Sequence, residues 1–188
     1  MATFFTSDSH HYHRNILKLC NRPFASVEEM DEVLIANWNS VITQPTDDVW
    51  MLGDFAYRQK KGSLGAIFQR LNGSKRLIIG NHDNDEVIEL PWVAVPTHYE
   101  EIKLDGTKIV LCHYPMRSWN GMYHGTLHLY GHEHGNIPDY ATCVDVGVDC
   151  WNYFPVTLAQ IKKRMATMPP NPILEAAKNR DKEKIIQT

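Results

Sequence analysis

The side chains best suited to chemistry lie in five short clusters. In chain order they are Asp8-Ser9-His10, Gly53-Asp54, Gly80-Asn81-His82-Asp83, His113 and Gly131-His132-Glu133-His134. An isolated Asp-x-His or Gly-Asp is more often a turn than a ligand site. The third and fifth clusters are more specific, because imidazoles at a strand end can face one pocket and glycine permits a sharp backbone exit. All five in this order predict a metal site.

The donors predict a site for two divalent cations. Two cations about 3.5–4 Å apart need a shared ligand, and a carboxylate on a rigid strand end suits that position. Asp54 is the candidate for it. The remaining donors are Asp8, His10 and His134 on one side and Asn81, His113 and His132 on the other. No thiolate stands at these positions, which disfavours structural zinc and suits Mn²⁺, Fe or catalytic Zn²⁺, with Mn²⁺ favoured.

Strands that end at one edge of a sheet are needed to bring the clusters together. The pattern predicts strands at 2–7, 49–52, 76–79, 127–130 and 142–148, and a hairpin from Tyr99–Leu104 and Thr107–Cys112. Amphipathic helices are predicted at 26–42, with a capping box of Ser26 and Glu29, and around 64–71. Apolar strands between such helices predict a mixed α/β sheet or a two-layer β core, with ligands at the strand ends.

The length of 188 residues predicts one domain, at 1–165, with a polar segment at 166–188. A short helix is predicted from 158 to about 165, and a proline-rich break at 168–172 precedes a solvated helix or frayed end, with an interaction segment as the alternative. No run approaches the about 18 apolar residues of a membrane span. The N-terminus reaches Asp8 before an apolar stretch forms, so we expect no secretory signal and a cytoplasmic location.

The net charge and the cysteines limit the classes of binding partner and cellular compartment that we expect. The net charge is −3, with 19 basic and 22 acidic residues, which gives no electrostatic footprint for long nucleic acid. The four cysteines form no C-x-x-C pair, and we expect free thiols in a reducing cytoplasm. The oligomeric state stays open.

Together the five clusters resemble the calcineurin-like metallophosphoesterases, whose pattern D-x-H, G-D, G-N-H-D/E, H and G-H-x-H is complete here. Residues 21–24 and 144–149 also resemble small bacterial and phage members. The resemblance implies an α/β fold, a β-sandwich of two mixed sheets flanked by helices. It implies that one metal is held by Asp8, His10, Asp54 and His134, and the other by Asp54, Asn81, His113 and His132. His82 would protonate the leaving oxygen, with Asp83 orienting it.

Residues outside the clusters are candidates for substrate contacts. The substrate phosphate is expected to meet Arg14, Asn15, Arg22 and Arg117, because guanidinium geometry matches phosphate oxygens. His11 and His13 line the pocket or belong to a solvated loop, and His98, His124 and His128 are expected to be structural or on the surface. Trp119 and Tyr123 stack a base or pack on the sheet edge.

The leading hypothesis is a hydrolase of a small, nucleotide-like phosphomonoester or phosphodiester, in which hydroxide activated by two metals attacks phosphorus in line. Only 19 positions separate His113 from His132, so no cap domain is inserted there. A metal-dependent nuclease is an alternative, which the excess of acidic over basic residues disfavours. A non-catalytic scaffold of the same fold is another, and it would be expected to have lost ligands or His82.

Overall fold

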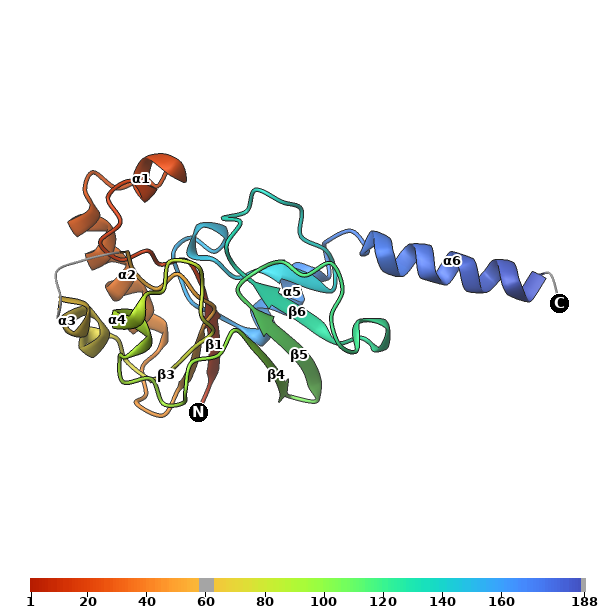
Figure 1. Cartoon of the computed structure of the whole chain (residues 1–188), viewed down its shortest axis with the longest axis horizontal. Helices are drawn as coiled ribbons and strands as arrows, with labels where there is room; N and C mark the ends of the chain where they lie inside the picture. The colour runs from red at the N-terminus through yellow and green to blue at the C-terminus, as the bar shows by residue number, and fades with distance from the viewer. Residues whose placement is uncertain (58–62, 187–188) are drawn as a thin grey trace.

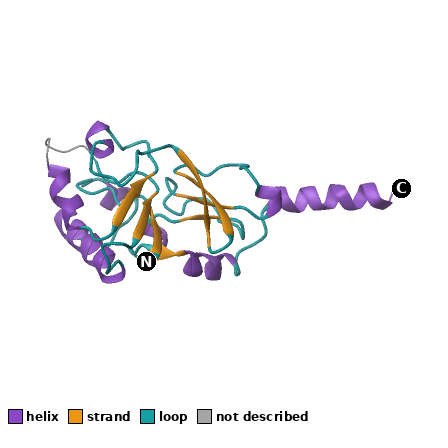
Figure 2. Cartoon of the chain, turned by 90° about the horizontal axis from the view of Figure 1, so that it is seen from below, coloured by secondary structure: helices purple, strands orange, loops and turns teal. Residues whose placement is uncertain are grey.

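Short strands build two four-stranded mixed sheets that pack face to face (Figures 1 and 2). The computed structural model describes residues 1–57 and 63–186. The first sheet has the order β3 (Ser74–Leu77), β2 (Asp48–Met51), β1 (Thr3–Thr6) and β8 (Val156–Thr157). The second has the order β4 (Tyr99–Leu104), β5 (Thr107–Cys112), β6 (Leu127–Tyr130) and β7 (Cys143–Asp145). The predicted sandwich of two mixed sheets is confirmed.

Apolar side chains fill the space between the two sheets and the outer face of the first sheet. Phe5 of β1, Leu129 of β6 and Val144 of β7 belong to the cluster between the sheets, together with Ile161 of α5 (Leu158–Met165). The outer face of the first sheet is covered by α2 (Val27–Val41), α3 (Ser63–Arg70) and α4 (Asp85–Ile88). Residues of β1 and β2 belong to both clusters, as expected for strands that read as apolar runs. β3 covers Ser74–Leu77, two residues before the predicted 76–79, and includes the polar residues Lys75 and Arg76.

The parallel register brings the strand ends to one edge. Thr6 of β1 pairs with Met51 of β2, which pairs with Leu77 of β3. In the second sheet Leu111 lies beside Leu129 of the next strand. A bridge between Ser7 and Gly147 joins the two edges. Residues that follow these strands therefore converge on one edge of the sandwich.

The start of α2 follows the predicted cap with one difference. The Ser26 hydroxyl accepts a hydrogen bond from the Glu29 amide at 3.1 Å. The Glu29 carboxylate accepts from the Ala25 amide at 2.6 Å, one residue before the position expected in a capping box. Both contacts satisfy amide groups at the start of the helix, so the helix begins where the pattern predicts.

The remaining α-helices of the described residues are α1 and α6. A single turn, α1 (Ile16–Leu19), follows the first cluster. The C-terminal helix α6 (Pro172–Ile186) projects away from the sheets (Figure 1), and Ile173 and Leu174 at its start pack against the outer face of the second sheet. The four cysteines are free. Among the helices described, none combines the length and the apolar character needed to cross a membrane.

Candidate metal centre

All seven predicted metal ligands meet at the shared edge of the two sheets. Asp54 Oδ2 lies 3.5 Å from His10 Nε2 and 3.5 Å from His113 Nε2, so this carboxylate stands between two groups of donors. One group joins Asp8, His10 and His134, and the other joins Asp54, His113 and His132, with the donor atoms of each within 4.8 Å of one another. Asn81 Oδ1 lies 3.1 Å from His113 Nε2 and completes the second group.

The donors have the spacing and the open valences that divalent cations need. His10 is 1% exposed, and neither of its ring nitrogens has a hydrogen-bond partner in the described part of the chain. Its 3.5 Å contact with Asp54 is too long for a strong hydrogen bond. Two ligands about 2.1 Å from one cation lie about 3–3.5 Å apart, which is close to this separation. The residues present therefore fit a pair of bound cations.

Burial and neighbouring charges set the protonation of the donors. Burial opposes a charge on Asp54, but the hydrogen bond and charge of His113 outweigh it and lower the pKa of Asp54 to about 2. Burial also opposes a charge on His113, but Asp54 and Asp8 raise its pKa to about 9. Burial raises the pKa of Asp8 to about 7. Asp54 is thus an anion at neutral pH, ready to bind cations.

The ligand positions carry an unusual backbone. Left-handed φ angles occur at five of the seven, with values of 58°, 51°, 55°, 72° and 50° at Asp8, His10, Asp54, His132 and His134. Such angles are uncommon for residues other than glycine and persist only where the surroundings impose them. Each strand leaves the sheet through a sharp turn, and the turn aims a donor into the common centre.

Glycines beside the ligands let neighbouring side chains approach the backbone closely. A Cβ at Gly131 would collide with Ser7 Oγ and Asp8 Oδ2. At Gly53, where φ is +93°, a Cβ would lie 2.5 Å from His113 Nδ1. We expected glycine in the fifth cluster to provide the turn, but there the ligands His132 and His134 take the left-handed angles, and Gly131 provides the space.

His82 lies at the centre without joining either donor group. Its ring is exposed, 5.3 Å from the ring of His10 and 6.1 Å from that of His13. Its backbone amide donates to Asp54 Oδ1 at 2.8 Å, which fixes the residue over the shared carboxylate. The imidazole is therefore placed to face a substrate bound at the centre.

The role expected for Asp83 is corrected. Its carboxylate is buried and accepts from three backbone amides, those of Asp54, Phe55 and Gly80, at 2.8–2.9 Å. Burial raises the pKa of Asp83 to about 6. Both carboxylate oxygens are taken by the backbone, so Asp83 ties the second cluster to the third and does not orient the His82 ring.

The two histidines after the first cluster differ. His13 stacks on Tyr57 with the ring centroids 4.0 Å apart, and its ring lies 5.3 Å from that of His10. His11 points the other way, with Nδ1 2.9 Å from Asp31 Oδ1 of α2. His13 thus lines the centre, whereas His11 anchors the loop. His128 is buried against the carbonyls of Val110 and Tyr114, and His98 and His124 are exposed, as expected.

The expected substrate residues separate into two kinds. Arg14 and Asn15 are exposed and line a polar cavity with His13 and Tyr57. Arg117 is exposed and lines a second cavity. Of the two aromatic residues considered for base stacking, Trp119 is buried and donates to the Thr126 carbonyl, so it packs in the core, and Tyr123 is exposed.

Arg22 has a structural role that differs from the expected phosphate contact. Its side chain is buried and pairs with Asp149, with Nε and Nη2 each 2.8 Å from a carboxylate oxygen. Its Nη1 and Nη2 also donate to the carbonyls of Ser9 and Asp8 at 2.9 and 2.7 Å. The guanidinium has no free edge for a phosphate, and it holds the backbone of the first cluster instead.

Asp149 is a residue of the site that the sequence pattern did not reveal. Its Oδ2 lies 2.7 Å from Nδ1 of His134, whose Nε2 faces Asp8 Oδ1 at 3.9 Å. Burial opposes a charge on His134, but the hydrogen bond to Asp149 outweighs it and raises the pKa of His134 to about 10. A carboxylate on the far nitrogen of a metal-binding histidine fixes the ring orientation and the tautomer. Asp149 therefore positions His134.

Comparisons with known proteins extend these observations. The chain is 34% identical over 168 residues to the uncharacterized protein MJ1445 of Methanocaldococcus jannaschii, covering 85% of this chain and 89% of that protein. It is 30% identical over 183 residues to the gene 66 protein of Mycobacterium phage L5, covering 79% and 87%. The crystal structure of AQ665, a protein of unknown function from Aquifex aeolicus, is similar with a TM-score of 0.69, 26% identity and coverage of 86% and 98%. No family model matches.

We expect Asp149→Ala to lower the affinity for divalent metal about 10–100-fold, because His134 loses the group that orients it. Calorimetric titration with Mn²⁺ measures the effect. Asp48→Ala, which removes a 2.7 Å ion pair with Arg76 in the first sheet, is the matched control and should bind Mn²⁺ like the wild type. Wild-type affinity in the Asp149 variant would contradict the positioning role.

We expect Asp54→Ala to lose both cations, because it removes the carboxylate that stands between the two donor groups. Elemental analysis of the purified protein measures the metal content per chain. Glu133→Ala removes a carboxylate from the fifth cluster that is not among the expected ligands, so this control should keep both ions. Two metals bound at wild-type affinity in the Asp54 variant would rule out the shared ligand.

Proposed function

We propose that the chain is a calcineurin-like metallophosphoesterase, a phosphoester hydrolase that uses two divalent cations. It belongs to one family with MJ1445 and the phage L5 gene 66 protein. The substrate is a small phosphomonoester or phosphodiester, nucleotide-like in size. Nitrogen and oxygen donors without a thiolate suit Mn²⁺, Fe or catalytic Zn²⁺, and of these we favour Mn²⁺.

One observation carries the proposal: seven donors and His82 converge on one edge of the sandwich, and the buried His10 ring has no protein partner for either nitrogen in the described residues. An unpaired buried imidazole is costly in a protein that binds nothing there. A scaffold that had abandoned the chemistry would be under no constraint to keep such a set. The complete set therefore supports catalysis.

Within the centre, the chain holds cations and supplies a proton. Two bound cations would lower the pKa of a water molecule and neutralise charge on the phosphoryl oxygens. Asp54, kept anionic by His113, holds the position between the donor groups. His82 stands exposed on the side of His10 and His13, where it donates a proton to the departing ester oxygen. Arg14 and Asn15 lie at the rim of the polar cavity on that side, within reach of a substrate phosphate.

Removal of metal should abolish turnover. After long incubation with excess chelator we expect no hydrolysis of bis(4-nitrophenyl) phosphate or 4-nitrophenyl phosphate, and added Mn²⁺ should restore at least part of the activity. Release of nitrophenolate measures both rates, and protein dialysed without chelator is the control. Undiminished turnover in the chelator would overturn the proposed function.

His82→Ala should keep the metal content near the wild-type value and lower turnover about 10²–10⁴-fold on esters with a poor leaving group, the usual span for general acid catalysis. The loss should shrink on nitrophenyl esters, because that leaving group needs little protonation. His132→Ala should instead lose metal and activity on all substrates alike. His98→Ala, an exposed histidine, is the matched control. An equal loss on good and poor leaving groups would contradict the acid role.

A further inference from the structure

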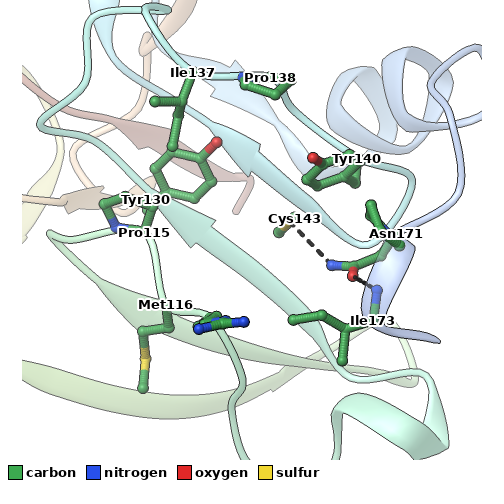
Figure 3. Close-up of a pocket in the computed structure, with 11 residues that line it drawn as sticks. Pro115, Met116, Tyr130, Ile137, Pro138, Tyr140, Cys143, Asn171 and Ile173 are labelled. Carbon is green, nitrogen blue, oxygen red and sulfur yellow. Dashed lines mark hydrogen bonds between the residues drawn. The ribbon is translucent and has the colours of Figure 1, made fainter. Parts of the chain in front are cut away.

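A second cavity lies on the outer face of the second sheet. It has a volume of about 300 Å³, at the lower end of the range for small-molecule sites. Figure 3 shows its lining, which is apolar apart from a few groups. The walls include Pro115, Met116, Arg117, Tyr130, Ile137 and Ile173.

Three walls of the cavity continue directly into the metal-binding clusters. Pro115 follows the ligand His113 by two residues, and Tyr130 precedes the ligand His132 by two. Two residues of chain span at most about 7 Å, so these walls begin close to the second donor group. Ile137 belongs to the loop that follows His134. The loops that carry these ligands therefore also form walls of the cavity.

Two tyrosines mark the two sides of the centre. Tyr57 contacts His13 and His82, with ring centroids 4.0 and 5.7 Å away. Tyr114 contacts His113 and His132, with ring centroids 5.1 and 4.8 Å away, and is 44% exposed. Asp54 stands between these sides, 3.5 Å from both His10 and His113. The polar cavity is lined by His13 and Tyr57 on the His82 side, and the apolar cavity is lined by Pro115, which follows Tyr114 in the chain.

This placement separates the two organic groups of a phosphodiester. If His82 donates to the departing oxygen, the leaving group lies on the side of His13 and Tyr57. In an in-line displacement the attacking oxygen enters opposite the leaving group, so a group retained on phosphorus extends sideways from that axis. The apolar cavity, one wall of which is Pro115 beside Tyr114, offers a site for it. The lining of proline, methionine, isoleucine and tyrosine suits a flat apolar group. The Arg117 guanidinium can stack on such a ring.

We propose that this apolar cavity is a subsite for a flat aromatic group, an aryl ring or a nucleobase, that is retained on phosphorus when the ester bond breaks. The proposal rests on the proposed function, and it adds the class of group that the protein selects. Tyr114, which is exposed and contacts the ligand His132, directly precedes Pro115 of the cavity wall.

Two diesters that share the nitrophenolate leaving group test the subsite. Thymidine 5′-(4-nitrophenyl phosphate) retains a nucleoside, whereas methyl 4-nitrophenyl phosphate retains a methyl group. We expect wild-type kcat/KM to favour the nucleoside ester by at least about 10-fold, the usual effect of an apolar pocket. Ile137→Asp, which places a charge on the cavity wall, should reduce this ratio about 10-fold. Val95→Asp, at an exposed position in the loop after α4, is the matched control and should leave the ratio unchanged.

Binding of the product gives a readout that does not depend on turnover. Calorimetry with thymidine 5′-monophosphate should show weaker binding to Ile137→Asp and to the cavity-filling Met116→Trp than to the wild type or Val95→Asp. Hydrolysis of both diesters without a preference for the nucleoside would overturn the subsite and leave the hydrolase intact. A ratio that Ile137→Asp does not alter would also overturn it. Hydrolysis of 4-nitrophenyl phosphate but of neither diester would overturn the subsite. Hydrolysis of none of the three esters by the metal-loaded protein would overturn the proposed function.

Discussion

The structure depends on keeping carboxylates and imidazoles buried at one sheet edge without pairing them completely. Burying polar groups is costly unless hydrogen bonds compensate. Backbone amides provide part of that compensation: the His132 amide donates to Asp8, and the His82 amide donates to Asp54 Oδ1. Asp54 Oδ2 faces His10 and His113 at 3.5 Å instead. Backbone amides thus stabilise the Asp8 and Asp54 carboxylates, and Asp54 Oδ2 is left to bind cations.

Holding this arrangement requires a rigid frame, because the ligand turns are strained. A left-handed residue other than glycine costs about 1–3 kcal/mol, and five ligands adopt that conformation. The packing between the sheets and the parallel register fix where each strand ends, so the turns cannot relax independently. Close approach at Gly53 and Gly131 removes the remaining freedom. The strained residues are the ligands themselves, and the packing of the two sheets holds them in that conformation.

Local patterns predicted the fold well, and contacts distant in sequence were missed. The hairpin of Tyr99–Leu104 and Thr107–Cys112 has the predicted bounds, because alternation and an Asp-Gly turn are local signals. The two-residue strand β8 and the short helices α1 and α4 were not predicted, since so few residues carry no period. The seven donors were found from cluster spacing, and the structure brings them together. The role of Asp83 was wrong because it depends on amides of Asp54 and Phe55 that the sequence does not place.

The contact between Arg22 and Asp149 is the clearest example of what the sequence could not predict. They lie 127 positions apart, and neither position has a motif that requires the other. The pair is buried, and removing one partner of such a pair typically costs about 3–5 kcal/mol because the other charge is left uncompensated. Arg22 holds the carbonyls of Asp8 and Ser9, and Asp149 holds His134, so one ion pair links both ends of the domain to the same donor group. Cations bound at this donor group would stabilise the folded state in which Arg22 and Asp149 are paired.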